Sequence, residues 1–252
     1  MTTTSPADST GRDPELLGQT VVLIGGSAGI GLATARRARA EGAEVVLTGR
    51  NAERLENAGR EVGARSTAAF DATDRAALER FFDDLPAPID HVLVTAGGPT
   101  YGPLLDMTAE EVRDALSDHI VQALEVARNA APKMRPAGTL IFMGGTGGRK
   151  VSAAGGIVSA ATAAIPQFAA GLALELAPVR VNVIAAGFVD TPLSASILGD
   201  QLEARRDELR NTLPIGRVVQ PQDVAALAVH IMANTALTGA TFDIDGGQQF
   251  VS

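Results

Sequence analysis

Short apolar runs alternate along this chain with longer segments whose apolar positions recur every three or four residues. The runs predict buried strands and the longer segments predict amphipathic helices. Strands are predicted at 21–24, 45–47, 66–70, 91–94, 139–143, 179–184 and 241–244. Helices are predicted at 30–41, 51–62, 75–85, 109–131, 159–177, 201–211 and 222–233. Buried strands that alternate with helices form βαβ units, so we expect an α/β fold with about seven mostly parallel strands and helices on both faces.

The chain of 252 residues predicts a single domain over 17–252, preceded by a flexible polar tail over 1–16. Hydrophobic residues make up 46% and charged residues 20%, which is enough apolar material for a folded core. The first 15 residues lack the basic segment and apolar core of a signal peptide. Charges are expected to interrupt every apolar stretch within about 18 residues, which argues against a membrane span and for a cytoplasmic protein.

Charge and missing residue types exclude several kinds of chemistry. The net charge of −8 argues against nucleic acid as a partner, because a phosphate backbone demands a basic surface. The absence of cysteine rules out disulfides, thiolate nucleophiles and cysteine-ligated metals, and no metal site is expected. Tryptophan is absent and Tyr101 is the only tyrosine, which limits the side chains that can donate a proton.

A glycine-rich segment follows the first predicted strand directly and opens the first predicted helix. Glycines let the backbone turn tightly and approach a pyrophosphate, while the amino end of the helix offers free N–H groups. This strand–turn–helix context predicts a Rossmann-like dinucleotide site; the alternative is a glycine-rich loop without a ligand. The expected contacts are Gly25, Ser27, Ala28, Gly29, Ile30 and Gly31.

The end of the second predicted strand suggests which dinucleotide binds. An acidic residue there would bind the adenosine 2′-hydroxyl and repel a 2′-phosphate. The acid is missing, and Arg50 and Asn51 follow Gly49 instead. Arginine can hold a phosphate with a charged, forked donor, so NADP(H) is favoured over NAD(H). The alternative is that Arg50 is simply solvated.

These residues resemble the short-chain dehydrogenase/reductase family over nearly the whole chain from residue 17. The family's Thr-Gly-x-x-x-Gly-x-Gly resembles the segment from Ile24 to Gly31. Its Asp-Val and Asn-Asn-Ala-Gly motifs resemble Asp71-Ala72 and Val94-Thr95-Ala96-Gly97. Its Pro-Gly turn with a downstream threonine, and its Asp-Gly-Gly, resemble Ala186-Gly187-Phe188-Val189-Asp190-Thr191 and Asp245-Gly246-Gly247.

The resemblance implies a nucleotide-dependent oxidoreductase that acts on a small molecule and forms a homodimer or homotetramer. It implies that Asp71 and Ala72 contact the adenine and that Thr191 contacts the nicotinamide carboxamide. The other cofactor contacts that it implies are Ala96, Gly97, Gly98, Gly187 and Val189.

The family's four catalytic positions are all changed in this chain. Its asparagine falls on His119, its serine on Gly145, its tyrosine on Val158 and its lysine on Thr162. In the family the tyrosine gives a proton to the substrate oxygen, the lysine cation stabilises its phenolate, and the serine holds the oxygen. Valine and glycine can do none of this, so we expect tyrosine-dependent carbonyl reduction to be absent or very weak.

Three side chains are candidate replacements, and each has an ordinary alternative. His119 is an acid–base group that can face the nicotinamide, or it is a histidine satisfied inside a helix bundle. Tyr101 follows the fourth strand beside the expected substrate mouth, or it is a half-exposed lid residue. Thr146 carries a hydroxyl one residue after the missing serine, or it is a turn residue.

Small residues and a proline change the space around these positions. If the helix from Ser159 continues, Pro166 removes the bond to the carbonyl of Thr162 and bends the helix. Glycines at 144, 145, 147 and 148 leave the facing loop without side chains. The site is therefore expected to be wider and less polar than is usual, or the small residues serve close packing between subunits.

Three functions remain open from the sequence. The first is an NADP(H)-binding oxidoreductase that acts on an unknown small carbonyl or alcohol through a nonstandard active site. The second is a nucleotide-binding pseudoenzyme that serves as a sensor or structural partner. The third is a non-redox isomerase or cyclase that uses the reshaped pocket.

Overall fold

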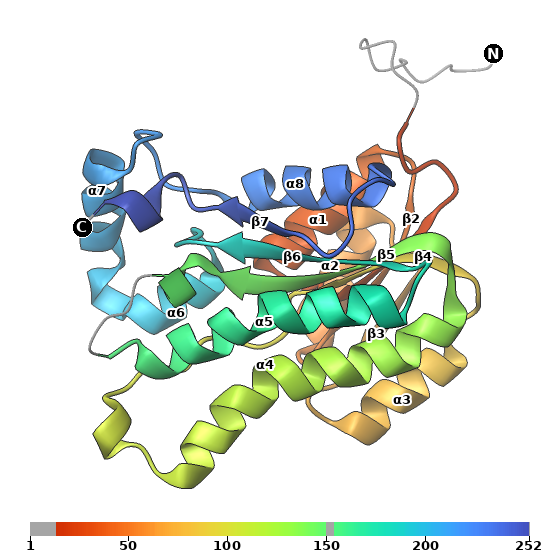
Figure 1. Ribbon diagram of the computed structural model, residues 1–252. Coiled ribbons are helices and arrows are strands. Elements are labelled where there is room, and N and C mark those ends of the chain that lie inside the picture. Colours follow the sequence, from red (N-terminus) through yellow and green to blue (C-terminus); the bar gives the residue numbers. More distant parts are fainter. Residues whose placement is uncertain (1–13, 150–153, 252) are drawn as a thin grey trace, which may run out of the picture.

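A seven-stranded parallel sheet forms the centre of the computed structural model, which describes residues 14–149 and 154–251 (Figure 1). The strand order is β3-β2-β1-β4-β5-β6-β7, and each neighbouring pair is parallel. The predicted doubly wound sheet is confirmed. The strands are β1 (Thr20–Ile24), β2 (Glu44–Gly49), β3 (Ser66–Ala69), β4 (Ile89–Val94), β5 (Met134–Gly145), β6 (Arg180–Ala186) and β7 (Thr241–Ile244).

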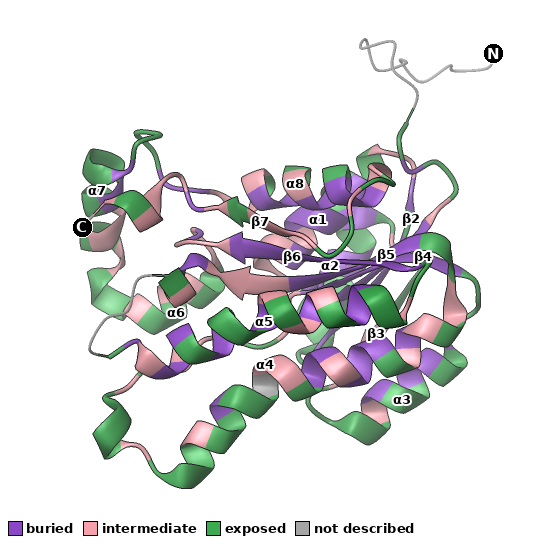
Figure 2. Cartoon of the chain, in the orientation of Figure 1, coloured by how far each residue is buried: buried purple, intermediate pink, exposed green. Residues whose placement is uncertain are grey.

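Helices cover both faces of the sheet, because successive strand residues point to opposite sides. In β1, Val21 and Leu23 face the core under α1 (Gly29–Ala40), α2 (Ala52–Val62) and α8 (Pro221–Ala233). Val22 and Ile24 face the other core, under α3 (Arg75–Asp84), α4 (Ala109–Ala130) and α5 (Gly156–Glu175). Figure 2 shows the strands mostly buried and the outer helix faces exposed.

Three elements differ most from the predicted pattern. Strand β5 begins at Met134, five residues before the predicted start. Helix α5 begins at Gly156, three residues before the predicted start, and continues past Pro166 to Glu175. The short helix α6 (Pro192–Leu198) was not predicted, and it precedes α7 (Leu202–Thr212). Its start has a readable signal, because Thr191 caps the helix with its side chain and Pro192 occupies the first helical position.

The expectation about charge interruption is wrong for α5. No charged residue lies between Lys150 and Glu175, and α5 is long and apolar enough to cross a membrane by length and composition alone. However, 44% of its apolar window is buried, and its inner face packs on the sheet core. Its apolar composition is therefore accounted for by packing. The predicted cytoplasmic location stays a prediction.

The chain reverses direction across the sheet between β1 and β4. From β1 it adds β2 and β3 on one side, and it then returns to place β4 on the other side of β1. Ligands of open α/β sheets bind beyond the carboxyl ends of the strands at such a switch point. The predicted cofactor residues occupy the loops after β1, β2, β3, β4 and β6, which brings them to this edge.

Part of the expected amino-terminal tail and one short internal segment fall outside the described residues. Residues 1–13 of the expected tail and Lys150 are not described. Leu16, at the end of the expected tail, is fully buried, and its amide donates to the Glu41 carbonyl at 3.0 Å.

Candidate functional site

The turn after β1 is packed so closely that side chains are excluded from it. Gly25 has φ +104°, and a Cβ there would lie 2.7 Å from the Ala96 amide nitrogen. A Cβ on Gly31 would lie 2.2 Å from the carbonyl oxygen of Gly25. The Thr95 hydroxyl donates to that same oxygen at 2.9 Å. The turn is therefore locked against the loop after β4, with its backbone bare enough for a phosphate to approach.

Helix α1 begins at this turn without a capping side chain. Its N-cap is Ala28, and its first turn contains no acidic residue. By contrast, the side chains of Asn51 and Asp74 accept from the first turns of α2 and α3. The free N–H groups and the positive dipole end of α1 are therefore available to an anion.

The end of β2 fits a 2′-phosphate better than a 2′-hydroxyl. A Cβ on Gly49 would lie 2.9 Å from the hydroxyl oxygen of Ser27, so there is little room for an acidic side chain. Arg50 is exposed, and its guanidinium has no hydrogen-bond or ion-pair partner among the described residues. Asn51 caps α2 by accepting from the Arg54 amide at 2.8 Å. The guanidinium of Arg50 is therefore available to a phosphate, whereas the Asn51 side chain is already used to cap α2.

Asp71, the acid that is expected to contact the adenine, is held in place by hydrogen bonds. Asp71 accepts hydrogen bonds from the amide and the hydroxyl of Thr73, at 3.0 and 2.8 Å. These bonds, with a smaller contribution from the charge of Arg50, lower the pKa of the Asp71 carboxyl. Ala72 beside it is buried.

The remaining predicted cofactor residues lie on two further loops. A Cβ on Gly29 would lie 3.4 Å from the Thr191 methyl group, so the glycine turn and the loop after β6 meet. A Cβ on Gly187 would lie 2.6 Å from the Asp245 side chain, which excludes any larger residue. Val189 is buried, and its carbonyl accepts from the Ser194 hydroxyl at 2.6 Å. The loop after β4 supplies Ala96, Gly97 and Gly98.

Three of the four changed catalytic positions, Gly145, Val158 and Thr162, lie next to one another. A Cβ on Gly145 would lie 3.2 Å from the Thr162 methyl group, so the family's serine and lysine positions are adjacent. The Thr162 hydroxyl donates to the Val158 carbonyl at 2.8 Å. The Ser159 hydroxyl donates to the Gly147 carbonyl at 2.9 Å. Both side chains are buried, and both hydroxyls donate hydrogen bonds to backbone carbonyls.

A pocket of about 180 Å³ opens beside these positions. Its one charged lining group, Arg149, is paired with Asp243 and also donates to Gln249 at 3.0 Å. The hydrogen bond from Arg149 lowers the pKa of the Asp243 carboxyl. The pocket walls are mostly small and apolar; whether the site is wider than is usual in the family stays a prediction. The lining residues are Gly144, Gly145, Gly148, Arg149, Thr162, Ala163, Pro166, Val183, Ala185 and Thr241.

Helix α4 presents two polar side chains one turn apart. Nδ1 of the half-buried His119 lies 3.1 Å from the Ala115 carbonyl oxygen. Because a carbonyl only accepts, Nδ1 carries a proton and Nε2 is left to exchange one. Gln122 is buried close to Gly97, and its Nε2 has no partner among the described residues. The sequence analysis missed Gln122, although its spacing of three from His119 places both on one helix face.

The other two candidate donors have contrasting environments. Tyr101 is 56% exposed on the loop after β4. The neighbouring Gly102 amide donates to the Ala154 carbonyl at 2.9 Å, which brings this loop beside the start of α5. Thr146 is buried at the first position of a short 3₁₀ helix, η3 (Thr146–Arg149). Tyr101 is thus close to the helix that carries Val158, and Thr146 is enclosed.

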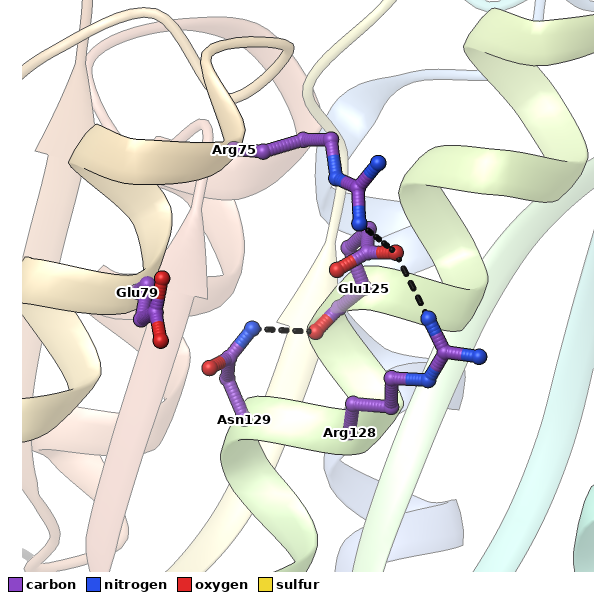
Figure 3. A pocket seen from close by; sticks show the side chains of 5 residues that line it. All are labelled: Arg75, Glu79, Glu125, Arg128 and Asn129. Carbon is purple, nitrogen blue, oxygen red and sulfur yellow. Dashed lines mark hydrogen bonds and ion pairs between the residues drawn. The ribbon is translucent and has the colours of Figure 1, made fainter.

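A second pocket, of about 230 Å³, lies between α3 and α4 and contains none of the predicted site residues (Figure 3). The nearly buried Glu125 carboxylate accepts from Arg75 at 3.1 Å and Arg128 at 2.9 Å. Asn129 donates to the Glu125 carbonyl at 2.8 Å, and Glu79 lines the opposite wall. We interpret this cluster as an ion-pair network that joins the two helices. Among the described residues, no group of acidic, histidine or cysteine side chains is arranged to hold a metal ion.

Comparisons with known proteins identify the family. A family model described as "Enoyl-(Acyl carrier protein) reductase" matches residues 25–249. The chain is 31% identical over 249 residues to an NADP-dependent (R)-specific alcohol dehydrogenase of Lentilactobacillus kefiri, covering 92% of this chain and 97% of that one.

Solved structures give the same result. The MalC reductase/Diels-Alderase of Malbranchea aurantiaca superposes with a TM-score of 0.87 at 26% identity, covering 94% of this chain and 99% of that one. BdcA in complex with NADPH superposes with a TM-score of 0.82 at 28% identity, covering 92% and 95%. The chain belongs to the short-chain dehydrogenase/reductase family. The NADP dependence and the bound NADPH of these relatives agree with the preference that the sequence predicted.

Proposed function

We propose that this protein is an NADP(H)-dependent oxidoreductase that acts on a small carbonyl or alcohol through a nonstandard active site. The observation that carries the proposal is the contrast between the two halves of the site. The glycine turn, the uncapped end of α1 and the free Arg50 form an intact nucleotide cradle. The catalytic positions beside it hold Gly145, Val158 and Thr162.

In this proposal, each part of the nucleotide has its own set of contacts in the cradle. The bare turn from Gly25 to Gly31 and the amino end of α1 would hold the pyrophosphate. Arg50, with the nearby Ser27 hydroxyl, would hold the 2′-phosphate, and Thr191 the nicotinamide carboxamide. When bound, the reduced nucleotide supplies a hydride to the carbonyl carbon of a substrate.

His119 is the side chain that best supplies the accompanying proton to the substrate oxygen. Its Nδ1–H is fixed by the Ala115 carbonyl, so proton exchange takes place at Nε2. Imidazole exchanges protons near neutral pH, whereas a free phenol is a weak acid there. The family's lysine position, which would stabilise a phenolate, is Thr162 in this chain, and no described lysine is paired with Tyr101. Tyr101 is therefore the second choice, and Thr146 is the third.

A nucleotide-binding pseudoenzyme is the second candidate function. The hydroxyls of Ser159 and Thr162 donate to backbone carbonyls. No hydroxyl at or beside the family's tyrosine and lysine positions is therefore left to donate a proton to a substrate. This arrangement is compatible with nucleotide binding alone, because the cradle does not depend on either hydroxyl.

We also propose that the protein forms a homodimer or homotetramer through α4 and α5. Val121 on α4 and Leu174 on α5 are exposed, and the outer face of α5 carries small residues that permit close helix packing. A second copy of the chain would cover this apolar face, in keeping with the symmetric assemblies of most soluble oligomers.

Two measurements separate these functions. NADPH binding is measured by calorimetry, and NADPH consumption is measured with a panel of ketones and aldehydes. The oxidoreductase is expected to bind NADPH and to consume it slowly with at least one carbonyl. Tight binding without consumption would favour the pseudoenzyme, and the absence of NADPH binding would contradict both.

A further inference from the structure

Large apolar side chains are exposed mainly at one end of the molecule. Most of the exposed large hydrophobic residues lie on the loop after β4, on α6, on the loop that follows α7, or near the carboxyl terminus. Leu105 is fully exposed and Tyr101 is 56% exposed. In Figure 1 these segments lie toward the left, where the arrowheads of β5, β6 and β7 point. A gathered apolar surface of this kind marks a binding site more often than isolated exposed residues do.

Two of these segments form walls, one against the changed catalytic helix and one against the predicted cofactor loop. Leu104 reaches to 2.8 Å from where a Cβ on Gly156 would stand, so it covers the first turn of α5. Leu193 lies 3.7 Å from the corresponding position on Gly98, in the predicted cofactor loop. Ile197 lies one turn further along α6 and is also exposed. One wall thus covers the helix turn that carries Val158, and the other borders the predicted cofactor loop.

Among the described residues, these walls offer no free cation to an anion. The loop over 98–107 and helix α6 contain no basic residue. On the adjoining α7, Arg206 is paired with Asp190 and Glu203, and Arg210 with Asp207. A carboxylate or phosphate placed between the walls would lose its hydration without gaining a cationic partner.

We propose that these walls bind an uncharged, predominantly apolar ketone or alcohol, and that Tyr101, Leu104, Leu193 and Ile197 select it. This proposal rests on the proposed oxidoreductase function for the identity of the reacting group. Acyl groups carried on a phosphate-bearing cofactor or carrier, and small keto acids, are excluded as preferred substrates by the same argument.

The composition of the chain provides a direct test. Because tryptophan is absent and Tyr101 is the only tyrosine, tyrosine fluorescence reports on this wall alone. The protein is titrated with methyl hexyl ketone and with an analogue that carries a carboxylate at the far end of the same chain. We expect saturable fluorescence changes, with the ketone bound at least about tenfold more tightly, which corresponds to about 1.4 kcal/mol. N-acetyltyrosinamide controls for collisional quenching.

Two variants locate the binding. Leu193→Asp is expected to weaken ketone binding by at least about tenfold, because it places a charge in the apolar wall. Leu17→Asp is the matched control, since Leu17 is 71% exposed and precedes β1, at the opposite end of the strands. If Leu193→Asp does not fold, Ile197→Asp replaces it.

Four results would overturn the proposal. In the titration, they are the absence of saturable ketone binding and binding of the carboxylate analogue that is as tight as that of the ketone or tighter. In the variants, they are equal effects of the Leu193 and Leu17 changes on ketone binding, and a change of oligomeric state in Leu193→Asp. The last would show that a second copy covers this surface. Because the readout is binding, a protein that never consumes NADPH would refute the proposed function and leave this test readable.

Discussion

At the scale of single residues, the two halves of the site are under different constraints. Gly25 and Gly31 stand where backbone atoms approach so closely that no side chain fits. Gly145 is less confined, because the nearest atom to an added Cβ is the Thr162 methyl group at 3.2 Å. The nucleotide cradle therefore depends on its glycines for its shape, whereas the catalytic positions can accept other residues.

Arg50 is predicted to select the 2′-phosphate. Arg50→Ala should weaken NADPH binding by about 1–3 kcal/mol, because a charged hydrogen bond is lost, and should leave NADH binding nearly unchanged. Calorimetric titration of both nucleotides measures the difference. Arg60→Ala is the matched control, since Arg60 is an exposed arginine on α2, the helix that follows Arg50, and donates to Asn57. Equal losses for NADPH and NADH would show that Arg50 does not contact the phosphate.

Restoring the family's catalytic residues is predicted to raise carbonyl reduction. Val158→Tyr alone should have little effect, because an isolated phenol has a pKa of about 10. Gly145→Ser and Thr162→Lys belong together, since the Thr162 methyl group crowds a side chain at 145. The triple variant should reduce ketones about 10²–10⁴-fold faster. The matched control places Phe at 158 with the same two changes; a similar gain there would contradict a role for the hydroxyl.

His91 is predicted to make the protein less stable in acid. It is buried in β4, Nε2 donates to the Gln19 side chain at 2.6 Å, and burial lowers its pKa from 6.5 to about 3. Below pH 6.5 His91 binds a proton in the unfolded chain but stays neutral in the folded protein. The free energy of unfolding therefore falls by about 1.4 kcal/mol for each pH unit of acidification. Urea unfolding at several pH values should show this slope, and His91→Gln should lack this share of it. An identical pH dependence in both proteins would refute the assignment.

Some of these residue roles could be predicted and others could not. The glycine turn and Arg50 follow from the residue pattern, and the changed positions at 145, 158 and 162 follow from the resemblance to the family. The commitment of the Thr162 hydroxyl to the Val158 carbonyl depends on a rotamer, which no pattern encodes. The proposed catalytic role of His119 stays a prediction from the sequence, to which the structure adds the hydrogen bond from Nδ1.

At the scale of elements, most strands were predictable because they are continuous apolar runs buried on both faces, and most helices because each has one buried face with a clear period. The start of α5 was predicted too late, because Gly155 and Gly156 give no apolar signal. Helix α6 was missed because its seven residues are too few to show a period, although Thr191 and Pro192 mark its start. Local capping signals therefore locate such short elements better than periodicity does.

Pro166 is predicted to cost α5 stability. It lies inside the helix, where it has no amide to donate to the Thr162 carbonyl. Pro166→Ala should therefore raise the free energy of unfolding, by up to about 3 kcal/mol. Urea unfolding measures the change. Pro221→Ala is the matched control, because Pro221 is at the first position of α8, where no bond is missing; it should give no gain. A loss of stability in Pro166→Ala would contradict this account.

At the scale of the whole molecule, the strand order places every predicted nucleotide contact at one edge of the sheet. The order could be predicted because right-handed crossovers leave few arrangements for alternating strands and helices. The assembly of copies could not, since it depends on the shape of the outer α4–α5 face.

That face is predicted to join two copies of the chain. Light scattering should give a mass of at least twice 25.9 kDa. Leu174→Asp should shift the protein toward the monomer, because it places a charge in the apolar contact. Leu17→Asp should leave the mass unchanged. A monomer at micromolar concentration would refute the assembly.

The central claim is that an intact NADP(H) cradle serves a catalytic site without the family's tyrosine. The most direct test is NADPH consumption with methyl hexyl ketone by the unmodified protein, His119→Gln and Tyr101→Phe, after confirming that all three bind NADPH. We predict turnover about 10²–10⁴-fold below the enzyme median of about 10 s⁻¹, lost in His119→Gln and retained in Tyr101→Phe. Turnover near 10 s⁻¹ that survives in both variants would contradict the account, because a proton donor elsewhere would then carry the reaction.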